Sequence, residues 1–291
     1  MPLPRLGVVI VTMGTRPREL EALLASVEKQ DVPAARVVLI GNATPLTDIA
    51  TDATKVPLEE NLGCPGGRNV GLKMLRESGD VDVVVELDDD GLLVAADVFR
   101  RIQQLFATDP KLGIIGFRVA DENGQTLRRW IPRLRASDPT RRGLVTTFPG
   151  GGHAFSVPML ERIGDWAGEF FFGHEESDLA WRALDDGWDI LYEPELVLQH
   201  PATPAARHAH FYRFTARNRV WLTRRRLPLL LIPVSLGLRI LLTMARIRSV
   251  SGLKAWWGGF FEGLRTPCGP RRPMSWRTVW RMTRLGRPPL I

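Results

Sequence analysis

Three adjacent carboxylates end an apolar stretch near the middle of the first half of the chain. Residues 81–87 read VDVVVEL, and Asp88, Asp89 and Asp90 follow directly. Neighbouring acids repel one another, and a hard divalent cation is the usual compensation. Side chains alternate along an extended chain, so Asp88 and Asp90 should point one way and Asp89 the other. The pattern favours a Mg²⁺ or Mn²⁺ site that also binds substrate phosphates; a solvated acidic turn is the alternative.

A glycine-rich segment precedes these acids. Residues 61–72 read NLGCPGGRNVGL, and a helical pattern follows near residues 70–77. Glycines permit close backbone approach and positive φ. Arg68 and the N-terminus of the following helix are suited to bind a diphosphate. An ordinary glycine-rich turn is the alternative.

A second acidic cluster lies in residues 170–182, which read FFFGHEESDLAWR. Glu175, Glu176 and Asp178 fall at the start of a helix that we expect to run through Leu184. A helix dipole stabilises acids in this position. A carboxylate here is also placed to act as a general base. The residues alone leave both interpretations open.

The elements around these motifs follow a regular order. Apolar runs at residues 7–13, 36–40 and 81–87 alternate with helical patterns at 17–30 and 70–77. This order predicts a parallel α/β sheet, whose ligands bind beyond the carboxyl ends of the strands. Further along we expect a helix at 97–106, a strand at 114–120, and a mobile arginine-rich loop at 128–142.

The motifs in this order resemble the family 2 glycosyltransferases with the GT-A fold. The resemblance covers about residues 7–225, and it includes VVIVTMGTR near the N-terminus and FYRFTARNRVW at residues 211–221. It implies an α/β, nucleotide-sugar-binding GT-A domain over residues 1–225 with a mostly parallel central sheet. A basic, apolar helical extension would then occupy residues 226–291.

The resemblance also implies roles for single residues. It assigns Glu176 as the catalytic base, and Asp90 and His200, with Asp88, as the metal ligands. For the acceptor or sugar pocket we expect Gly152, His153, Glu175 and Asp178, although a structural role fits His153 equally well. The residues expected to contact the donor are Thr12, Arg16, Asn42, Gly67, Arg68, Asn69, Asp88 and Asp89.

The expected activity is an inverting, metal-dependent transfer of one sugar from a nucleoside-diphosphate sugar to a hydroxyl. Asn42 follows Gly41 where the family usually has an acid that binds the base, so the nucleotide stays open. No Gln-x-x-Arg-Trp motif of processive members occurs, which favours single transfer. The acceptor is a glycan, a lipid-linked sugar or a secondary metabolite, with rhamnosyl transfer as one option. An inactive membrane-associated nucleotide-sugar-binding protein and a nucleotidyltransferase are the alternatives.

Charge divides the chain of 291 residues into two parts. Residues 201–291 contain 18 Lys and Arg and the single acid Glu262, and the rest of the chain is net acidic. The apolar stretch 227–242 is interrupted by Pro228, Pro233 and Arg239, and a membrane span needs about 20 residues. We therefore expect an interfacial helix on an anionic membrane. A buried helix and a true span are the alternatives, and the apolar residues between the charges argue against nucleic acid.

Composition sets the broader limits. Hydrophobic residues make up 44% and charged residues 24%, which excludes disordered and fibrous classes. Two cysteines, Cys64 and Cys268, are too few for a disulfide framework, and no signal-peptide pattern begins the chain. We expect a cytoplasmic protein, peripheral on the inner face of the plasma membrane. The tail aromatics Trp256, Trp257, Phe260 and Phe261 also suit such an interface.

Overall fold

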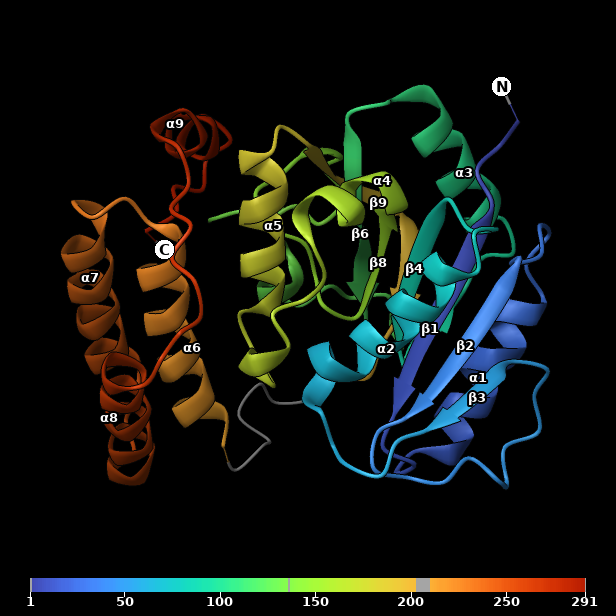
Figure 1. The fold of residues 1–291 in the computed structure, drawn as a ribbon, viewed down its shortest axis with the longest axis horizontal. Helices are drawn as coiled ribbons and strands as arrows, with labels where there is room; N and C mark the ends of the chain where they lie inside the picture. The colour runs from blue at the N-terminus through green and yellow to red at the C-terminus, as the bar shows by residue number, and fades with distance from the viewer. Residues whose placement is uncertain (1, 136, 203–209, 291) are drawn as a thin grey trace.

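The computed structural model describes residues 2–135, 137–202 and 210–290. Within these ranges a mixed nine-stranded sheet separates two layers of helices (Figure 1). The strand order is β3-β2-β1-β4-β8-β6-β9-β5, and β7 pairs with β9. Only β5, β7 and β8 run against the others, so the sheet is mostly parallel, as predicted.

The longer strands coincide with apolar runs in the sequence. The predicted runs at 7–13, 36–40 and 81–87 form β1, β2 and β4, which are buried because helices cover both faces of the sheet. The strands are β1 (Leu6–Thr12), β2 (Arg36–Gly41), β3 (Thr54–Pro57), β4 (Val83–Asp88), β5 (Leu92–Leu93), β6 (Leu112–Ala120), β7 (Gly143–Leu144), β8 (Gly152–Ser156) and β9 (Asp189–Gln199).

Two apolar cores lie on opposite faces of the sheet. Leu20, Leu23 and Leu24 recur at helical spacing on α1 (Pro17–Glu28) and pack with α3 (Val98–Thr108) on one face. The other face is covered by α2 (Gly63–Glu77), α4 (Val157–Ile163) and α5 (Glu175–Asp185). The helices predicted at 17–30, at 97–106 and through Leu184 are therefore confirmed.

The glycine-rich segment is helical, which corrects the expectation of a loop before residue 70. Helix α2 begins at Gly63 and includes the motif from that residue onward. Gly67 and Gly71 face β1, and a Cβ at either position would lie 2.9 or 2.6 Å from a methyl carbon of Val11 or Val9. The glycines therefore let the helix approach the sheet closely.

The arginine-rich segment 128–142 is a loop, as predicted, apart from a 3₁₀ turn at Arg128–Trp130. Its residue 136 lies outside the described residues. Nothing in the structure tests its mobility, which stays a prediction.

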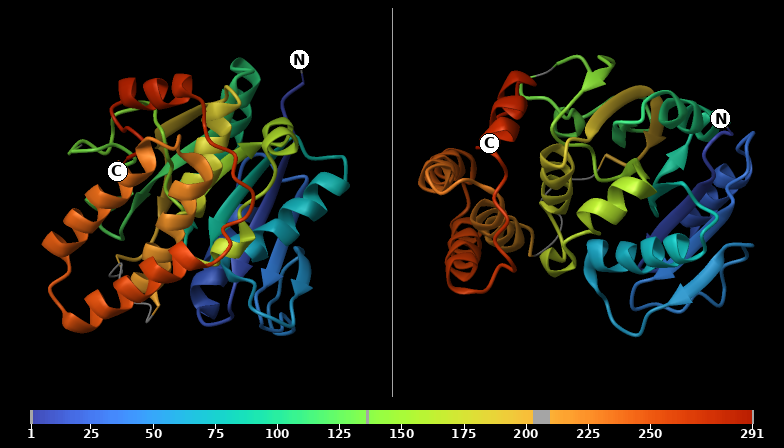
Figure 2. Two further views of the ribbon diagram at one scale, coloured as in Figure 1. Left: turned by 60° about the vertical axis from the view of Figure 1, so that its left-hand side comes forward. Right: turned by 45° about the horizontal axis from the view of Figure 1, so that its top comes forward.

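The C-terminal region is helical, as predicted, and packs on the body. It consists of α6 (Phe211–Arg226), α7 (Leu231–Arg246), α8 (Val250–Arg265) and α9 (Trp276–Arg284). Helices α6, α7 and α8 form a group beyond α5 (Figure 2). Trp221 and Leu222 of α6 belong to the core of the body, whereas Ala216 and Val220 pack with α8. The boundary expected at residue 225 therefore falls in a helix that both regions share.

Some aromatic residues of this region do not lie at the surface, where the sequence led us to expect them. Trp256 and Phe260 are buried in the small core that α6 and α8 form, so they are not available to a membrane interface, contrary to expectation. Among the described residues, no helix has both the length and the apolar character needed to cross a membrane.

Candidate active site

The acidic triplet lies at the edge of the sheet where parallel strands β1, β4 and β9 end. Asp88 is the last residue of β4, and His200 follows β9 directly. The backbone N–H of Asp88 donates to Gly151, and that of His200 donates to Ala120. The sheet ladder therefore fixes where both side chains begin.

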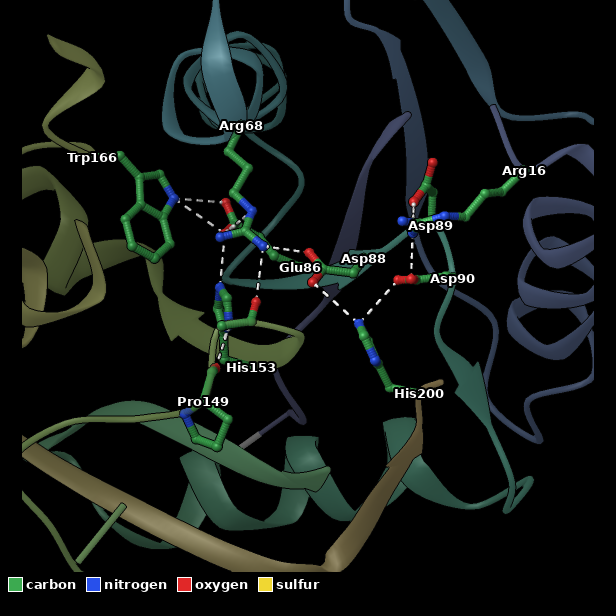
Figure 3. A network of polar contacts seen from close by, with 11 residues as sticks. Arg16, Arg68, Glu86, Asp88, Asp89, Asp90, Pro149, His153, Trp166 and His200 are labelled. Carbon is green, nitrogen blue, oxygen red and sulfur yellow. Dashed lines mark hydrogen bonds and ion pairs between the residues drawn. The ribbon is translucent and has the colours of Figure 1, made fainter. Parts of the chain in front are cut away.

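Asp88, Asp90 and His200 converge from these two strands (Figure 3). His200 Nε2 lies 3.0 Å from Asp90 Oδ1 and 4.0 Å from Asp88 Oδ2. One ligand atom from each of the three residues lies within 4.8 Å of the others. Carboxylate oxygens suit Mg²⁺ or Mn²⁺, and an imidazole nitrogen is a suitable ligand for Mn²⁺. The residues present therefore fit a divalent cation.

His200 is oriented by its other ring nitrogen. Nδ1 lies 2.9 Å from the carbonyl oxygen of Pro201, and a carbonyl only accepts, so Nδ1 carries a proton. Burial on its own lowers the pKa of His200, but the hydrogen bond to Asp90 and the charges of Asp88 and Asp90 outweigh it and raise the pKa. A proton and a cation compete for Nε2, so acid should weaken cation binding.

Asp89 is not part of this group. Asp89 and Asp90 lie in a turn, in which the backbone N–H of Gly91 donates to the carbonyl of Asp88, so the alternation expected for an extended chain does not apply here. Thr12 Oγ1 donates to Asp89 Oδ2 at 2.7 Å, and Arg16 Nη1 contacts both Asp89 and Asp90. Burial, followed by repulsion from Asp88 and Asp90, raises the pKa of Asp89 against the hydrogen bond from Thr12. The loop after β1 thus supplies one positive charge to the triplet.

Arg68 supplies a second positive charge from the inner side of α2. Its side chain is 3% exposed, and its Nη2 donates to Asp88 Oδ1 at 2.7 Å and to the carbonyl of Gly150 at 2.8 Å. Its guanidinium also lies 5.2 Å above the ring of Trp166. The arginine expected to meet a diphosphate therefore holds the first acid of the triplet.

A buried polar network supports Arg68 from behind (Figure 3). Glu86 Oε2 lies 3.6 Å from Arg68 Nε and 2.8 Å from His153 Nε2, and Trp166 Nε1 donates to both Glu86 oxygens. Glu86 and His153 are fully buried. The sequence reasoning missed Glu86, although an acid inside the apolar run VVVEL was a visible signal.

Three residues expected in the acceptor or sugar pocket lie elsewhere. His153 belongs to the buried network, and Gly152 packs against Phe117 and Leu198. Asp178 is fully buried between Arg226 and Arg182, at 2.7 and 2.8 Å. Burial opposes the charge of Asp178, but these arginines hold its pKa below the usual range. All three residues are therefore buried in the protein around the site, where they can support it.

Glu175 and Glu176 begin α5 and line a cavity of about 210 Å³. The cavity is also lined by Arg68, Asp88 and His200, and Trp130 from the arginine-rich loop closes one side. A Cβ on Gly150 would lie 2.3 Å from Glu176 Oε1, so a larger residue there would displace this carboxylate. The acid pair therefore faces the same space as Asp88 and His200, two of the three candidate metal ligands.

The two glutamates have unusual protonation behaviour. Burial, reinforced by the neighbouring Glu176, raises the pKa of Glu175 to about 8, and its Oε2 has no hydrogen-bond partner among the described residues. Burial also raises the pKa of Glu176. A raised carboxyl pKa close to neutrality suits proton transfer. Cys64 lines the same cavity, but burial raises the pKa of its thiol, which argues against a nucleophile.

The turn before α5 is held by Asn218 of α6. Its Nδ2 donates to the carbonyl oxygens of Phe170, Phe172 and Gly173 at 2.8 to 2.9 Å. Phe171 and His174 in this turn have φ of 64° and 72°, which is uncommon for side chains other than glycine. Asn218 lies within the motif FYRFTARNRVW, whose role the sequence reasoning left unassigned.

Asn42 and Asn69, two expected donor contacts, are engaged with the protein. Asn42 Nδ2 donates to Asn61 at 2.9 Å, and its Oδ1 accepts from the backbone of Leu62 at 2.8 Å. Asn69 makes two 3.0 Å hydrogen bonds with the backbone of Trp166. Both therefore brace loops at the edge of the site, and their contact with a donor stays a prediction.

The sequence model described as glycosyl transferase family 2 matches residues 8–164, which is more than half of the chain. The chain belongs to glycosyl transferase family 2. No match was found among curated proteins.

Solved structures share its fold. They include GalNAc-T7 with UDP, GalNAc and Mn²⁺ (TM-score 0.60, 15% identity, 87% of this chain and 54% of that chain). A second is the mannosyltransferase PcManGT from Pyrobaculum calidifontis in complex with GDP-Man and Mn²⁺ (0.53, 18%, 98% and 85%). A third is S. aureus TarS 1–349 in complex with UDP (0.58, 14%, 90% and 81%). The chain spans about half the length of GalNAc-T7. The GT-A fold predicted from the sequence is confirmed.

Asp90→Asn should remove the effect of Mn²⁺ on nucleotide binding. The substitution keeps the shape of the side chain and deletes the charge that binds the cation. Calorimetry with UDP and GDP, with and without Mn²⁺, measures the effect. The exposed Asp48→Asn is the matched control and should behave as the wild type. An Mn²⁺ effect of equal size in Asp90→Asn would contradict the metal assignment.

Glu175 should make stability depend on pH. The folded chain keeps a proton on Glu175 up to about pH 8, whereas the unfolded chain releases it near pH 4.3. Stability should therefore fall as pH rises between these values. Thermal unfolding of Glu175→Gln should show a shallower fall than the wild type. The exposed Glu161→Gln serves as control, and equal slopes in all three proteins would refute the assignment.

Proposed function

We propose that the chain transfers one sugar from a nucleoside-diphosphate sugar to an acceptor hydroxyl, with inversion at the anomeric carbon. The observation that carries the proposal is one cavity shared by Glu176, Asp88 and His200. A base and an anion-binding group must reach the same substrate, and this cavity lets them do so. Membership of glycosyl transferase family 2 supports the reaction class.

Glu176 is the proposed base. Its raised pKa favours acceptance of the proton from the acceptor hydroxyl as that oxygen attacks the sugar. One displacement with one base inverts the anomeric centre. Glu175, with its pKa raised to about 8, carries a proton at neutral pH and leaves the negative charge to its neighbour.

Asp88, Asp90 and His200 would hold Mg²⁺ or Mn²⁺, which neutralises charge on the leaving diphosphate when bound. Arg68 holds Asp88 in place through its contact at 2.7 Å. Thr12 and Arg16 position Asp89 and Asp90 in the same way. The protein thus pre-orients the charges before a donor enters.

The donor is proposed at the level of a nucleoside-diphosphate sugar. The neighbouring structures were solved with UDP or with GDP-Man, so both bases are candidates for this chain. The position after the second strand carries Asn42 in place of an acid. The side chain of Asn42 is hydrogen-bonded to Asn61 and to the backbone of Leu62. The acceptor is a glycan, a lipid-linked sugar or a secondary metabolite, and rhamnosyl transfer remains one option.

Two other functions are distinguishable. An inactive nucleotide-sugar-binding protein would bind the donor without hydrolysing it. A nucleotidyltransferase would release pyrophosphate from a nucleoside triphosphate and would leave Glu176 without a role. A hydrolysis screen over UDP-, dTDP- and GDP-sugars, with Mg²⁺ or Mn²⁺, separates the three cases.

Glu176→Gln should lower kcat by about 10²–10⁴-fold, the usual contribution of general acid–base catalysis. The amide keeps the shape of the side chain but cannot take a proton, so donor affinity should survive. Turnover and calorimetric donor binding are measured on the same preparation, with Glu161→Gln as a matched surface control. Retained activity in Glu176→Gln together with its loss in Glu175→Gln would move the base to Glu175.

We also propose that the chain acts at an anionic membrane surface on the cytoplasmic side. Helix α7 packs through Leu236 and Ile240 and presents its opposite face to solvent. Leu229 and Leu230, which directly precede α7, line one cavity with Trp276 of α9. Trp276 and Trp280 of α9 are 47% and 62% exposed. The exposed apolar residues of this face are Leu229, Leu230, Pro233, Val234, Leu241 and Met244.

Charge favours lipid over a second copy of the chain as the occupant of this face. The exposed residues Arg246, Arg248 and Arg277 lie on or next to α7 and α9. Glu262, the single acid of residues 201–291, already pairs with Arg213 and Arg217. Two such basic faces would repel each other, whereas anionic lipid attracts each basic residue by about 1 kcal/mol.

The double variant Leu230→Gln/Leu241→Gln should lose flotation with anionic liposomes. These side chains are 76% and 70% exposed, so their replacement removes apolar contact with lipid without opening a core. Leu3→Gln, at an exposed leucine of the body, is the control. Wild-type flotation should need anionic lipid and weaken in high salt. Undiminished flotation of the double variant would reject this face as the contact.

A further inference from the structure

Three arginines without acidic partners lie where the extension meets the body. Arg219 comes from α6, Arg239 from α7, and Arg287 from the segment after α9. Among the described residues, none of the three forms an ion pair with a carboxylate. Arg219 is only 3% exposed, and its Nε and Nη2 have no hydrogen-bond partner within the described chain.

Several elements bring these arginines together. Arg219 lies 5.9 Å from the ring of Trp181 on α5. Ser235, one turn before Arg239 on α7, donates to the carbonyl of Leu290 at 3.4 Å, which places the C-terminal segment beside α7. The cluster therefore occupies the seam between body and extension.

Burial of this cluster is unfavourable without an anion. Burial, together with the charges of Arg239 and Arg287, lowers the pKa of Arg219 to about 9. The same three arginines, after burial itself, hold the pKa of nearby His174 well below its usual range, and His174 Nε2 is also unpartnered. Buried charges are normally paired.

Other buried arginines of the chain show the normal arrangement. Arg68 contacts Asp88, Arg225 contacts Glu169, and Arg226 contacts Asp178. The cluster of Arg219, Arg239 and Arg287 differs because no acid of the described chain neutralises it. Arg239 and Arg287 are only partly buried, so a ligand from solvent can reach the group.

We propose that Arg219, Arg239 and Arg287 form a binding site for a phosphoryl group. Guanidinium groups match phosphate oxygens in geometry and charge, and a phosphate monoester or diphosphate supplies the two or more negative charges that three arginines require. The site does not depend on the transfer reaction. Its ligand is a free phosphate compound or the phosphate of a lipid headgroup, and the apolar face of α7 makes the second source accessible.

Calorimetry with inorganic phosphate and pyrophosphate tests the site. EDTA is present, so that binding through a divalent cation is excluded. The wild type should bind, and Arg219→Met and Arg287→Gln should each weaken binding by about tenfold or more, the order expected for loss of a charge-assisted contact. Arg18→Gln, an exposed charge on α1, should bind as the wild type does.

Thermal unfolding separates a binding role from a structural one. Without phosphate, Arg219→Met should keep or raise the Tm, because it removes a buried charge that has no partner. Phosphate should raise the Tm of the wild type and of Arg18→Gln, but not that of Arg219→Met. A lowered Tm with an unchanged response to phosphate would overturn the proposal.

Vesicles distinguish the two sources of the phosphoryl group. Phosphatidylcholine vesicles containing phosphatidic acid expose a phosphate monoester, and vesicles containing phosphatidylglycerol at equal charge expose a diester. Preference for phosphatidic acid that Arg219→Met abolishes identifies a lipid headgroup. Equal binding to both vesicles, with soluble phosphate binding retained, identifies a free phosphate compound. Absence of both the preference and the soluble binding would refute the site.

Discussion

Repulsion among Asp88, Asp89 and Asp90 is the constraint around which the site is built. Two like charges roughly 4 Å apart repel by about 4 kcal/mol at the dielectric typical near a protein surface. The chain offsets this repulsion with the charges of Arg16 after β1 and Arg68 from α2, and His200 after β9 contacts Asp90. Each of these three groups comes from a different element, so the triplet can end β4 only when the sheet and α2 are in place.

Through Arg68, the acidic triplet also depends on how the core is packed. A buried guanidinium needs acids around it, and Glu86 and Asp88 flank it at 3.6 and 2.7 Å. Its position requires α2 to approach β1 closely, which Gly67 and Gly71 permit. The glycine-rich motif thus serves the acidic triplet through helix packing, and the diphosphate role expected for it would be indirect.

Local patterns in the sequence were enough to predict the helices and strands in which the spacing of apolar residues follows directly from burial. The apolar runs of β1, β2 and β4 mark strands that are buried on both faces, and the leucine spacing of α1 follows the helical period of 3.6 residues. The alternation expected for Asp88, Asp89 and Asp90 fails because a turn begins at Asp88. Long-range pairing leaves no such pattern. Asp178 pairs with Arg226, 48 residues away, and His153 with Glu86, 67 residues away. Two-residue strands such as β5 are likewise too short to show a period.

The uneven distribution of charge along the chain has two consequences. Ion pairs attach the basic C-terminal helices to the acidic body, and some arginines of these helices are left without an acidic partner. Residues 201–291 contain one acid, Glu262, which two local arginines already use. Other arginines of the extension reach acids of the body: Arg225 pairs with Glu169, Arg226 with Asp178, and Arg281 with Asp189. These pairs dock the basic helices against the acidic body beside α5, whose first turn carries Glu175 and Glu176. Because the body cannot supply an acid to every arginine, the positive charge that remains must attract anions from outside the chain.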